Sequence, residues 1–151
     1  MRNSDRLQGS KAVWLTRAVD FSSSLRYRNP DLDEQENQRL FGRKALQHGH
    51  NYHLEVTLRG VPDPLTGMVI DLKDLQGILD REIMARFDHR DLNGDTPYFE
   101  KAAPTPENFV QVIRRILAGA LPPDMLAAIR LQEDAETWVE WLEPESDRCS
   151  R

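Results

Sequence analysis

Residues 48–60 read HGHNYHLEVTLRG, and the pattern of this stretch indicates the fold class. From Tyr52 to Arg59 apolar and polar residues alternate, so the apolar ones face one side and the polar ones the other. Alternation of this length is typical of a strand that buries one face of an antiparallel sheet. His48 and His50 stand two residues apart on this strand, so their imidazoles emerge on the same face.

Two histidines on one strand face can reach a single metal ion, and only four histidines occur in the chain. The alternative is a pair of polar strand residues that hydrogen bond a loop, and the residues alone favour neither. His53 points to the opposite face, so it is a poor third ligand unless the strand bulges. We expect His53 to be a surface residue.

The other elements follow from apolar spacing, caps and turn residues. Before the histidine strand we expect a strand within 13–24 that ends near Phe21, and then a polar irregular segment over 26–47. After it come a short extended piece at Val69 and Ile70, a helix over 72–87 capped by Asp71, and a second helix that is capped by Thr105, begins at Pro106 and is stopped by Pro122. The last element is a hairpin of 127–134 and 136–143 that turns at Asp134 and Ala135.

This order predicts an α+β fold in which a four-stranded antiparallel sheet carries both helices on one face. Such a sheet leaves two open edges and one uncovered face, so we expect the chain to form a homo-oligomer. At 151 residues the chain suits one domain over 1–151, with its core at about 12–143. Residues 1–10 and 144–151 are expected to be frayed.

Composition excludes several functions. A net charge of −5 argues against a nucleic-acid binder, and no apolar run is long enough to span a membrane. The start of the chain lacks the apolar stretch of a secretory signal. The single cysteine, Cys149, sits in a polar tail and has no internal disulfide partner, so we expect a cytoplasmic protein.

Three further groups carry possible chemistry. The Asp88 carboxylate can orient His89 as a general base. The alternative is structural: Asp88 begins a turn and His89 caps the carbonyls of a helix. Glu133 closes an apolar strand and can accept two parallel hydrogen bonds from a guanidine-like edge, or be a strand-end charge. The last group is a cluster of basic residues before the histidine pair: Arg26, Arg28, Arg39, Arg43 and Lys44. It forms either a basic rim that holds an anionic substrate or an ordinary solvated loop.

Together these pieces resemble one family, the 6-pyruvoyltetrahydropterin and 6-carboxytetrahydropterin synthases. The likeness rests on LFGRK, HGHNYHLEVTLRG, DPLTGMVIDLKDL, FDHRDLN, TPYF, PTPEN and LQED, which span about residues 14–142. It implies the tunnelling fold, in which trimers close a twelve-stranded barrel, two trimers form a hexamer, and active sites lie between subunits. It also implies a reduced pterin as substrate, such as 7,8-dihydroneopterin triphosphate, and carbon–oxygen lyase chemistry.

The resemblance also implies roles for single residues. In the family three histidines bind zinc, a cysteine removes a proton, and an aspartate and a histidine assist. Carried over to this chain, His48 and His50 are zinc ligands, and Asp88 and His89 are the assisting pair. Glu133 and Thr105 fall at pterin-contact positions.

Two positions depart from the family pattern. Leu25 in FSSSL replaces the first zinc histidine, and Lys44 in KALQHGH replaces the cysteine, so the zinc ligand set is incomplete. Glu34, Glu36 or a neighbouring subunit can supply a ligand instead. Lys44 has three possible roles: a base, an amine that forms a Schiff base, or an exposed cation near the substrate phosphates.

We therefore expect a pterin-binding family member whose lyase chemistry is altered or weakened. The alternative is a catalytically inactive pterin-binding or structural homologue. Whether the protein is an enzyme is left open by the sequence.

Overall fold

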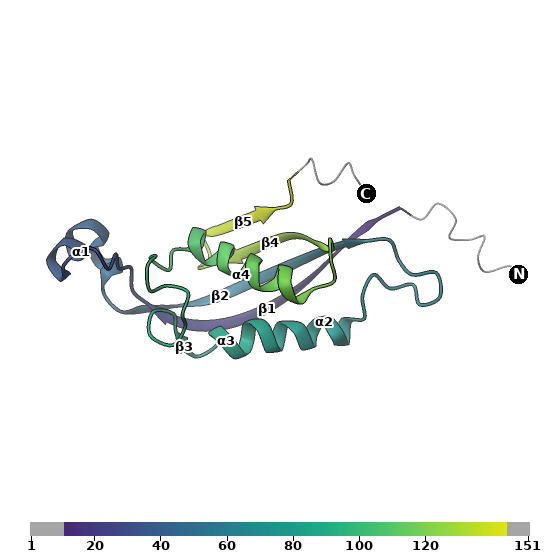
Figure 1. Ribbon diagram of the computed structural model, residues 1–151, viewed down its shortest axis with the longest axis horizontal. Coiled ribbons are helices and arrows are strands. Elements are labelled where there is room, and N and C mark those ends of the chain that lie inside the picture. The colour runs from purple at the N-terminus through teal and green to yellow at the C-terminus, as the bar shows by residue number, and fades with distance from the viewer. Residues whose placement is uncertain (1–10, 145–151) are drawn as a thin grey trace, which may run out of the picture.

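The computed structural model describes residues 11–144. Over that range the chain forms an α+β fold in which a five-stranded mixed sheet and helices pack around one apolar core (Figure 1). The strands are β1 (Val13–Leu25), β2 (His48–Gly60), β3 (Arg90–Asp91), β4 (Leu126–Gln132) and β5 (Trp138–Leu142). The helical elements are α1 (Glu34–Phe41), α2 (Leu72–Leu79), α3 (Ala85–Phe87) and α4 (Pro106–Ala120), with a short 3₁₀ turn at Gly42–Ala45 and a π turn at Asp80–Met84.

The sheet has the order β3-β1-β2-β4-β5, and β1, β2, β4 and β5 are antiparallel neighbours. The alternation in β2 is confirmed, because Tyr52, Leu54, Val56 and Leu58 are all buried. Phe21 of β1 stacks on Tyr52 with ring centroids 5.1 Å apart. The apolar residues of both strands therefore form one covered face.

Both long predicted helices lie on that face. Phe21 contacts Phe87 of α3 and Phe109 of α4, with ring centroids 6.2 and 5.9 Å apart. Asp71 and Thr105 cap α2 and α4 as expected, because each side chain accepts a backbone N–H of the first turn. The predicted helix over 72–87 is one continuous helical run from α2 to α3, interrupted only by the π turn.

Several sequence predictions were wrong in detail. The sheet is not four-stranded and purely antiparallel, because β3 adds a two-residue parallel pair to β1 at Ser23 and Ser24. Strand β1 continues past Phe21 to Leu25, and Val69 and Ile70 form bends rather than a strand. The hairpin of β4 and β5 is confirmed, with Asp134 and Ala135 inside its turn.

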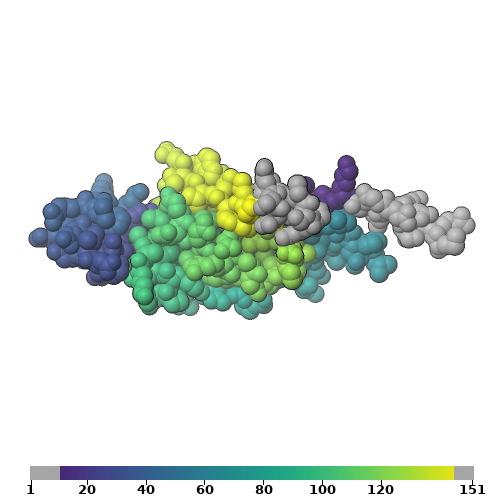
Figure 2. Space-filling view, turned by 45° about the horizontal axis from the view of Figure 1, so that its top comes forward, coloured from purple at the N-terminus to yellow at the C-terminus, as the bar shows by residue number. Residues whose placement is uncertain are grey.

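The segment over 26–47 is not irregular. It contains α1, which begins with a full capping box between Asp33 and Glu36. Asn37 is the buried anchor of this helix, since its side chain accepts the N–H of Asn29 and donates to three backbone carbonyls. This segment forms one end of the elongated molecule, shown in blue in Figure 2.

Among residues 11–144 no helix is long and apolar enough to cross a membrane. The ends expected to be frayed are 1–10 and 144–151, and all of them except residue 144 lie outside the described residues, as does Cys149. The single domain, the cytoplasmic location and the oligomeric barrel stay predictions.

Candidate functional site

The histidine pair sits on the covered face of β2, near the end of the sheet. In the β1–β2 ladder, Leu25 is opposite His48, and Ser23 is opposite His50. The rings of His48 and His50 lie edge to face, with centroids 5.2 Å apart. The same-face placement of the two imidazoles is therefore as predicted. His53 lies on the opposite face, where its Nδ1 is 2.6 Å from Oδ1 of Asp20.

His50 lies against Glu133, which follows directly after β4. His50 Nε2 is 2.7 Å from Glu133 Oε1, and the exposed fractions of the two side chains are 19% and 10%. This is the spacing of an ion pair, but the N–H direction is wrong for a hydrogen bond, so Nε2 is a buried nitrogen without a hydrogen-bond partner among the described residues. The contact joins a strand-borne imidazole to a buried carboxylate.

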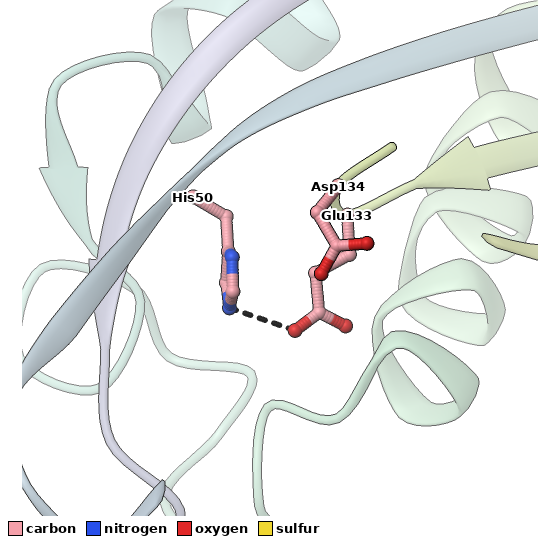
Figure 3. A group of neighbouring side chains, drawn as sticks. All are labelled: His50, Glu133 and Asp134. Atoms are coloured by element: carbon pink, nitrogen blue, oxygen red, sulfur yellow. Dashed lines mark ion pairs between the residues drawn. The ribbon is translucent and has the colours of Figure 1, made fainter. Parts of the chain in front are cut away.

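Asp134 completes this group (Figure 3). One ligand atom each from His50, Glu133 and Asp134 lies within 4.8 Å of the other two. Strand β2 pairs with β4 only from His53 onward, so residues 48–52 form a free edge next to the β4–β5 turn. A cleft of about 420 Å³ opens between this edge and the turn, and it is lined by His50, Glu133 and Asp134 among others.

Burial and hydrogen bonds set the charges of His50 and Asp134. Loss of solvent lowers the pKa of His50 below its ordinary value, and the nearby His48 and Lys44 act in the same direction, while Glu133 opposes them. The imidazole is therefore held towards its neutral form. The pKa of the Asp134 carboxyl is lowered mainly by the hydrogen bond that it accepts from the backbone N–H of Glu136.

The family's three-histidine zinc site does not fit these residues. Leu25 is 1% exposed and belongs to the apolar core, so an aliphatic side chain lies where the family resemblance implies a third ligand. His48 Nδ1 forms a 2.7 Å hydrogen bond with the carbonyl of Leu46, which leaves Nε2 as its available ligand atom. Within residues 11–144 the single group of three potential ligands is His50, Glu133 and Asp134, and it leaves out His48.

The two loop glutamates considered as substitute ligands are engaged in α1. Glu36 accepts the backbone N–H of Asp33 in the capping box at 2.8 Å. Glu34 lies 3.9 Å from Arg26. Neither is part of a potential ligand group with the histidine pair in the part of the chain that the structure describes.

Asp88 and His89 are held beside β1. Asp88 accepts the backbone N–H of Ser22 at 3.0 Å, and His89 donates its own N–H to the carbonyl of Ser22 at 2.7 Å. The hydrogen bond from Ser22 is the main cause that lowers the pKa of Asp88. His89 has a φ of 57°, a conformation that non-glycine residues rarely adopt, and its Nδ1 lies 3.0 Å from Asp88. The pair is thus fixed as a strained turn.

His89 and His50 line the same cleft. A second cleft of about 520 Å³ is lined by Ser23, His50, His89 and Asp91 among others. The structure therefore brings His89 and His50 to one cleft, and His50 and Glu133 to another. Thr105 lines neither cleft, and its hydroxyl is used to cap α4 by accepting the N–H of Asn108.

Lys44 is exposed in the single chain. Its Nζ lies 5.3 Å from the centroid of the Tyr27 ring. Tyr27 is buried and stands near His48, with ring centroids 6.1 Å apart. Burial, with Glu133 and Glu107 adding to it, raises the pKa of Tyr27 to about 12, so the phenol stays protonated. Lys44 and His48 line a third cleft, of about 280 Å³.

Sequence reasoning missed two members of this neighbourhood. Asp134 was treated only as a turn residue, and Tyr27 was not singled out. A signal for Asp134 existed, because it directly follows Glu133. No pattern in the sequence marks Tyr27, since its place beside Lys44 depends on the 3₁₀ turn that folds back against it.

Comparisons with known proteins identify the family of this chain. The family model described as 6-pyruvoyl tetrahydropterin synthase matches residues 14–144. The chain is similar to the 6-pyruvoyl tetrahydrobiopterin synthases of Poecilia reticulata and Homo sapiens, at 39% and 38% identity, over 80% and 79% of this chain and 83% of each relative. The solved structure of the Caenorhabditis elegans 6-pyruvoyl tetrahydropterin synthase superposes with a TM-score of 0.82 at 29% identity, covering 88% of this chain and 96% of the other. The chain therefore belongs to the 6-pyruvoyl tetrahydropterin synthase family.

Proposed function

We propose that this protein binds a reduced pterin, such as 7,8-dihydroneopterin triphosphate, in the cleft beside Glu133. The observation that carries the proposal is the buried Glu133 carboxylate at the edge of an open cleft. Among residues 11–144 its carboxylate contacts His50 Nε2, without hydrogen-bond geometry. A buried carboxylate is stable only when donors satisfy it, and the adjacent N–H groups of a pterin's pyrimidine ring are donors of the right spacing.

The lyase chemistry of this protein is altered or weakened relative to that of a 6-pyruvoyl tetrahydropterin synthase. Two features support this proposal. Leu25 fills the third zinc position with a core side chain, and Lys44 is exposed where the family has its cysteine. Asp88 and His89 keep a fixed geometry near His50, so the groups that would assist proton transfer are retained.

The assembly we propose is a homotrimer or homohexamer with the family's barrel. The edge of β1, which β3 covers at Ser23 and Ser24 alone, and the edge strand β5 are the places where strands of another copy would pair. Large apolar residues exposed on the strands would be covered by this assembly: Val13, Trp14, Trp138 and Leu142. The mass of the particle in solution, measured by light scattering, tests this proposal, and a monomer would contradict it.

Turnover tests the enzymatic part. Purified protein is incubated with 7,8-dihydroneopterin triphosphate, with and without added Zn²⁺, and released triphosphate and modified pterin are measured. We expect at most a small fraction of synthase turnover. Turnover at the rate of a full synthase would refute the altered chemistry.

Calorimetry tests the binding part. We expect Glu133→Gln to weaken pterin binding about tenfold or more, because the charge-assisted pair is lost. The matched control is Glu136→Gln, which removes a charge from an exposed residue of the same turn and should leave affinity unchanged. Equal affinities of all three proteins would remove Glu133 from the site.

A second candidate function is pterin binding without any turnover. The complete burial of Leu25 favours it, because the metal position has been absorbed into the core. The two candidates differ in one result. Binding with no product at long incubation supports the inactive binder, and slow product release supports the altered enzyme.

A further inference from the structure

We propose that His50, Glu133 and Asp134 form a divalent metal site that replaces the three-histidine site of the family. This inference does not rest on pterin binding. It follows from the placement of one imidazole and two carboxylates around a single point at the free edge of β2.

The distances suit a first-row divalent ion. The three ligand atoms lie within 4.8 Å of one another, and the His50 to Glu133 contact is 2.7 Å. Ligand bonds of about 2.0–2.2 Å in a tetrahedral site hold ligand atoms about 3.4 Å apart. An ion therefore requires the His50 ring to turn so that the Nε2 lone pair faces Glu133, and the two side chains to separate by less than about 1 Å.

His50 Nε2 is the atom that points to this use. It is buried, lies next to a carboxylate, and has no hydrogen-bond partner among residues 11–144. A buried ring nitrogen without a partner is destabilising, and coordination of a cation would satisfy it. In Figure 3 a dashed line joins Nε2 to the Glu133 carboxylate, and the Asp134 carboxylate lies next to that of Glu133.

The Asp134 carboxylate is also oriented. The backbone N–H of Glu136 donates to Asp134 Oδ1 at 2.9 Å, and the backbone and side chain of Thr137 hydrogen bond the same carboxylate. Such outer hydrogen bonds fix the direction of a metal ligand. The site opens to solvent through the cleft of about 420 Å³, so an ion and its remaining water ligands have an entry path.

His48 is outside the proposed site. Its imidazole is not part of the group of ligand atoms formed by His50, Glu133 and Asp134, and the position opposite it holds Leu25. The metal site is thus displaced along β2, away from the position opposite Leu25 and towards the β4–β5 turn. One imidazole and two carboxylates suit Zn²⁺, Mn²⁺ or Co²⁺. Glu133 cannot give both oxygens to a pterin while one binds an ion, so metal and pterin should compete.

The experiment is a Zn²⁺ titration of the whole protein by calorimetry in a non-chelating buffer. We expect one ion per chain for the wild type. Asp134→Asn, an exposed substitution that keeps the hydrogen bond from Glu136, should weaken binding about tenfold to a hundredfold. His48→Gln should change affinity by less than about threefold. His53→Gln, on the opposite face of the same strand, is the matched control and should change nothing.

The opposite pattern would overturn the proposal. If His48→Gln abolishes Zn²⁺ binding and Asp134→Asn does not, the ion sits on the histidine pair. Absence of any Zn²⁺ binding by the wild type also refutes it. A circular dichroism melt of each variant checks folding. A reduced pterin should weaken Zn²⁺ binding, and failure of this last arm alone would count against the pterin proposal and leave the metal site standing.

Discussion

Leu25 lies directly opposite His48 in the β1–β2 ladder, on the covered face of the sheet. Opposite residues of an antiparallel pair have Cβ atoms about 5 Å apart, so residue 25 is the position on β1 from which a third ligand would join the histidine pair. The side chain there is an isobutyl group with 1% of its surface exposed. If residue 25 is the family's third ligand position, that position is part of the apolar core in this chain.

The roles of positions 25 and 44 can be tested by restoring the family's histidine and cysteine there. We expect Leu25→His together with Lys44→Cys to raise synthase activity at least tenfold over the wild type in the presence of Zn²⁺. The reason is that the variant regains the third imidazole and the thiol, while Asp88 and His89 are already in place. Product release is measured by chromatography.

The single Leu25→His variant separates metal binding from catalysis. A buried imidazole without a partner destabilises the fold, and Zn²⁺ should compensate. Its melting temperature should rise when Zn²⁺ is added, by more than that of the wild type. An equal rise in both proteins would mean that residue 25 does not face the histidine pair.

Leu25 should also contribute to stability as an ordinary core residue. We expect Leu25→Ala to lower the free energy of unfolding by about 2–5 kcal/mol, because it leaves a cavity. Leu65→Ala is the matched control, since Leu65 is 95% exposed. Denaturant unfolding measures both. A loss below about 1 kcal/mol for Leu25→Ala would show that its side chain is not packed.

Asp88 gives a pH-dependent contribution to stability. Its pKa is lowered below the ordinary 3.8, mainly by the hydrogen bond from the N–H of Ser22. The unfolded chain binds this proton more readily, so the stabilisation is complete above pH 3.8 and is lost as the pH falls through the lowered value. Unfolding free energies of the wild type and Asp88→Asn should differ at pH 6 and converge in acid. A difference that does not change with pH would contradict this origin.

The anchor of α1 makes a separate prediction. Asn37 is 2% exposed and holds the loop before the helix through four hydrogen bonds. We expect Asn37→Ala to destabilise α1 by about 2 kcal/mol, because backbone groups of the loop lose their partners. Hydrogen exchange of the α1 amides should become at least about tenfold faster. Gln38→Ala, one residue along and exposed, should leave the exchange rates unchanged.

The sequence predicts the long elements of this fold well. Alternation in β2 and the apolar spacing of α4 are strong local patterns, and both elements form where expected. Helix α1 was missed because its polar sequence, EQENQRLF, has no apolar stripe. The capping box of Asp33 and Glu36 was the available signal. Strand β3 depends on contacts with β1 and has no pattern of its own.

The site was predictable only in part. The shared face of His48 and His50 follows from strand periodicity alone. The contact of His50 with Glu133 joins residues far apart in sequence, and it requires the free edge of β2 that no local pattern reveals. The strained turn of His89 is likewise imposed by hydrogen bonds to Ser22.

The proposed reduced-pterin pocket beside Glu133 does not depend on a zinc ligand at position 25. Calorimetry of the wild-type protein with 7,8-dihydroneopterin triphosphate, in the absence of added metal, measures binding to this pocket. We expect saturable binding with one pterin per chain. No detectable binding at millimolar pterin would contradict it.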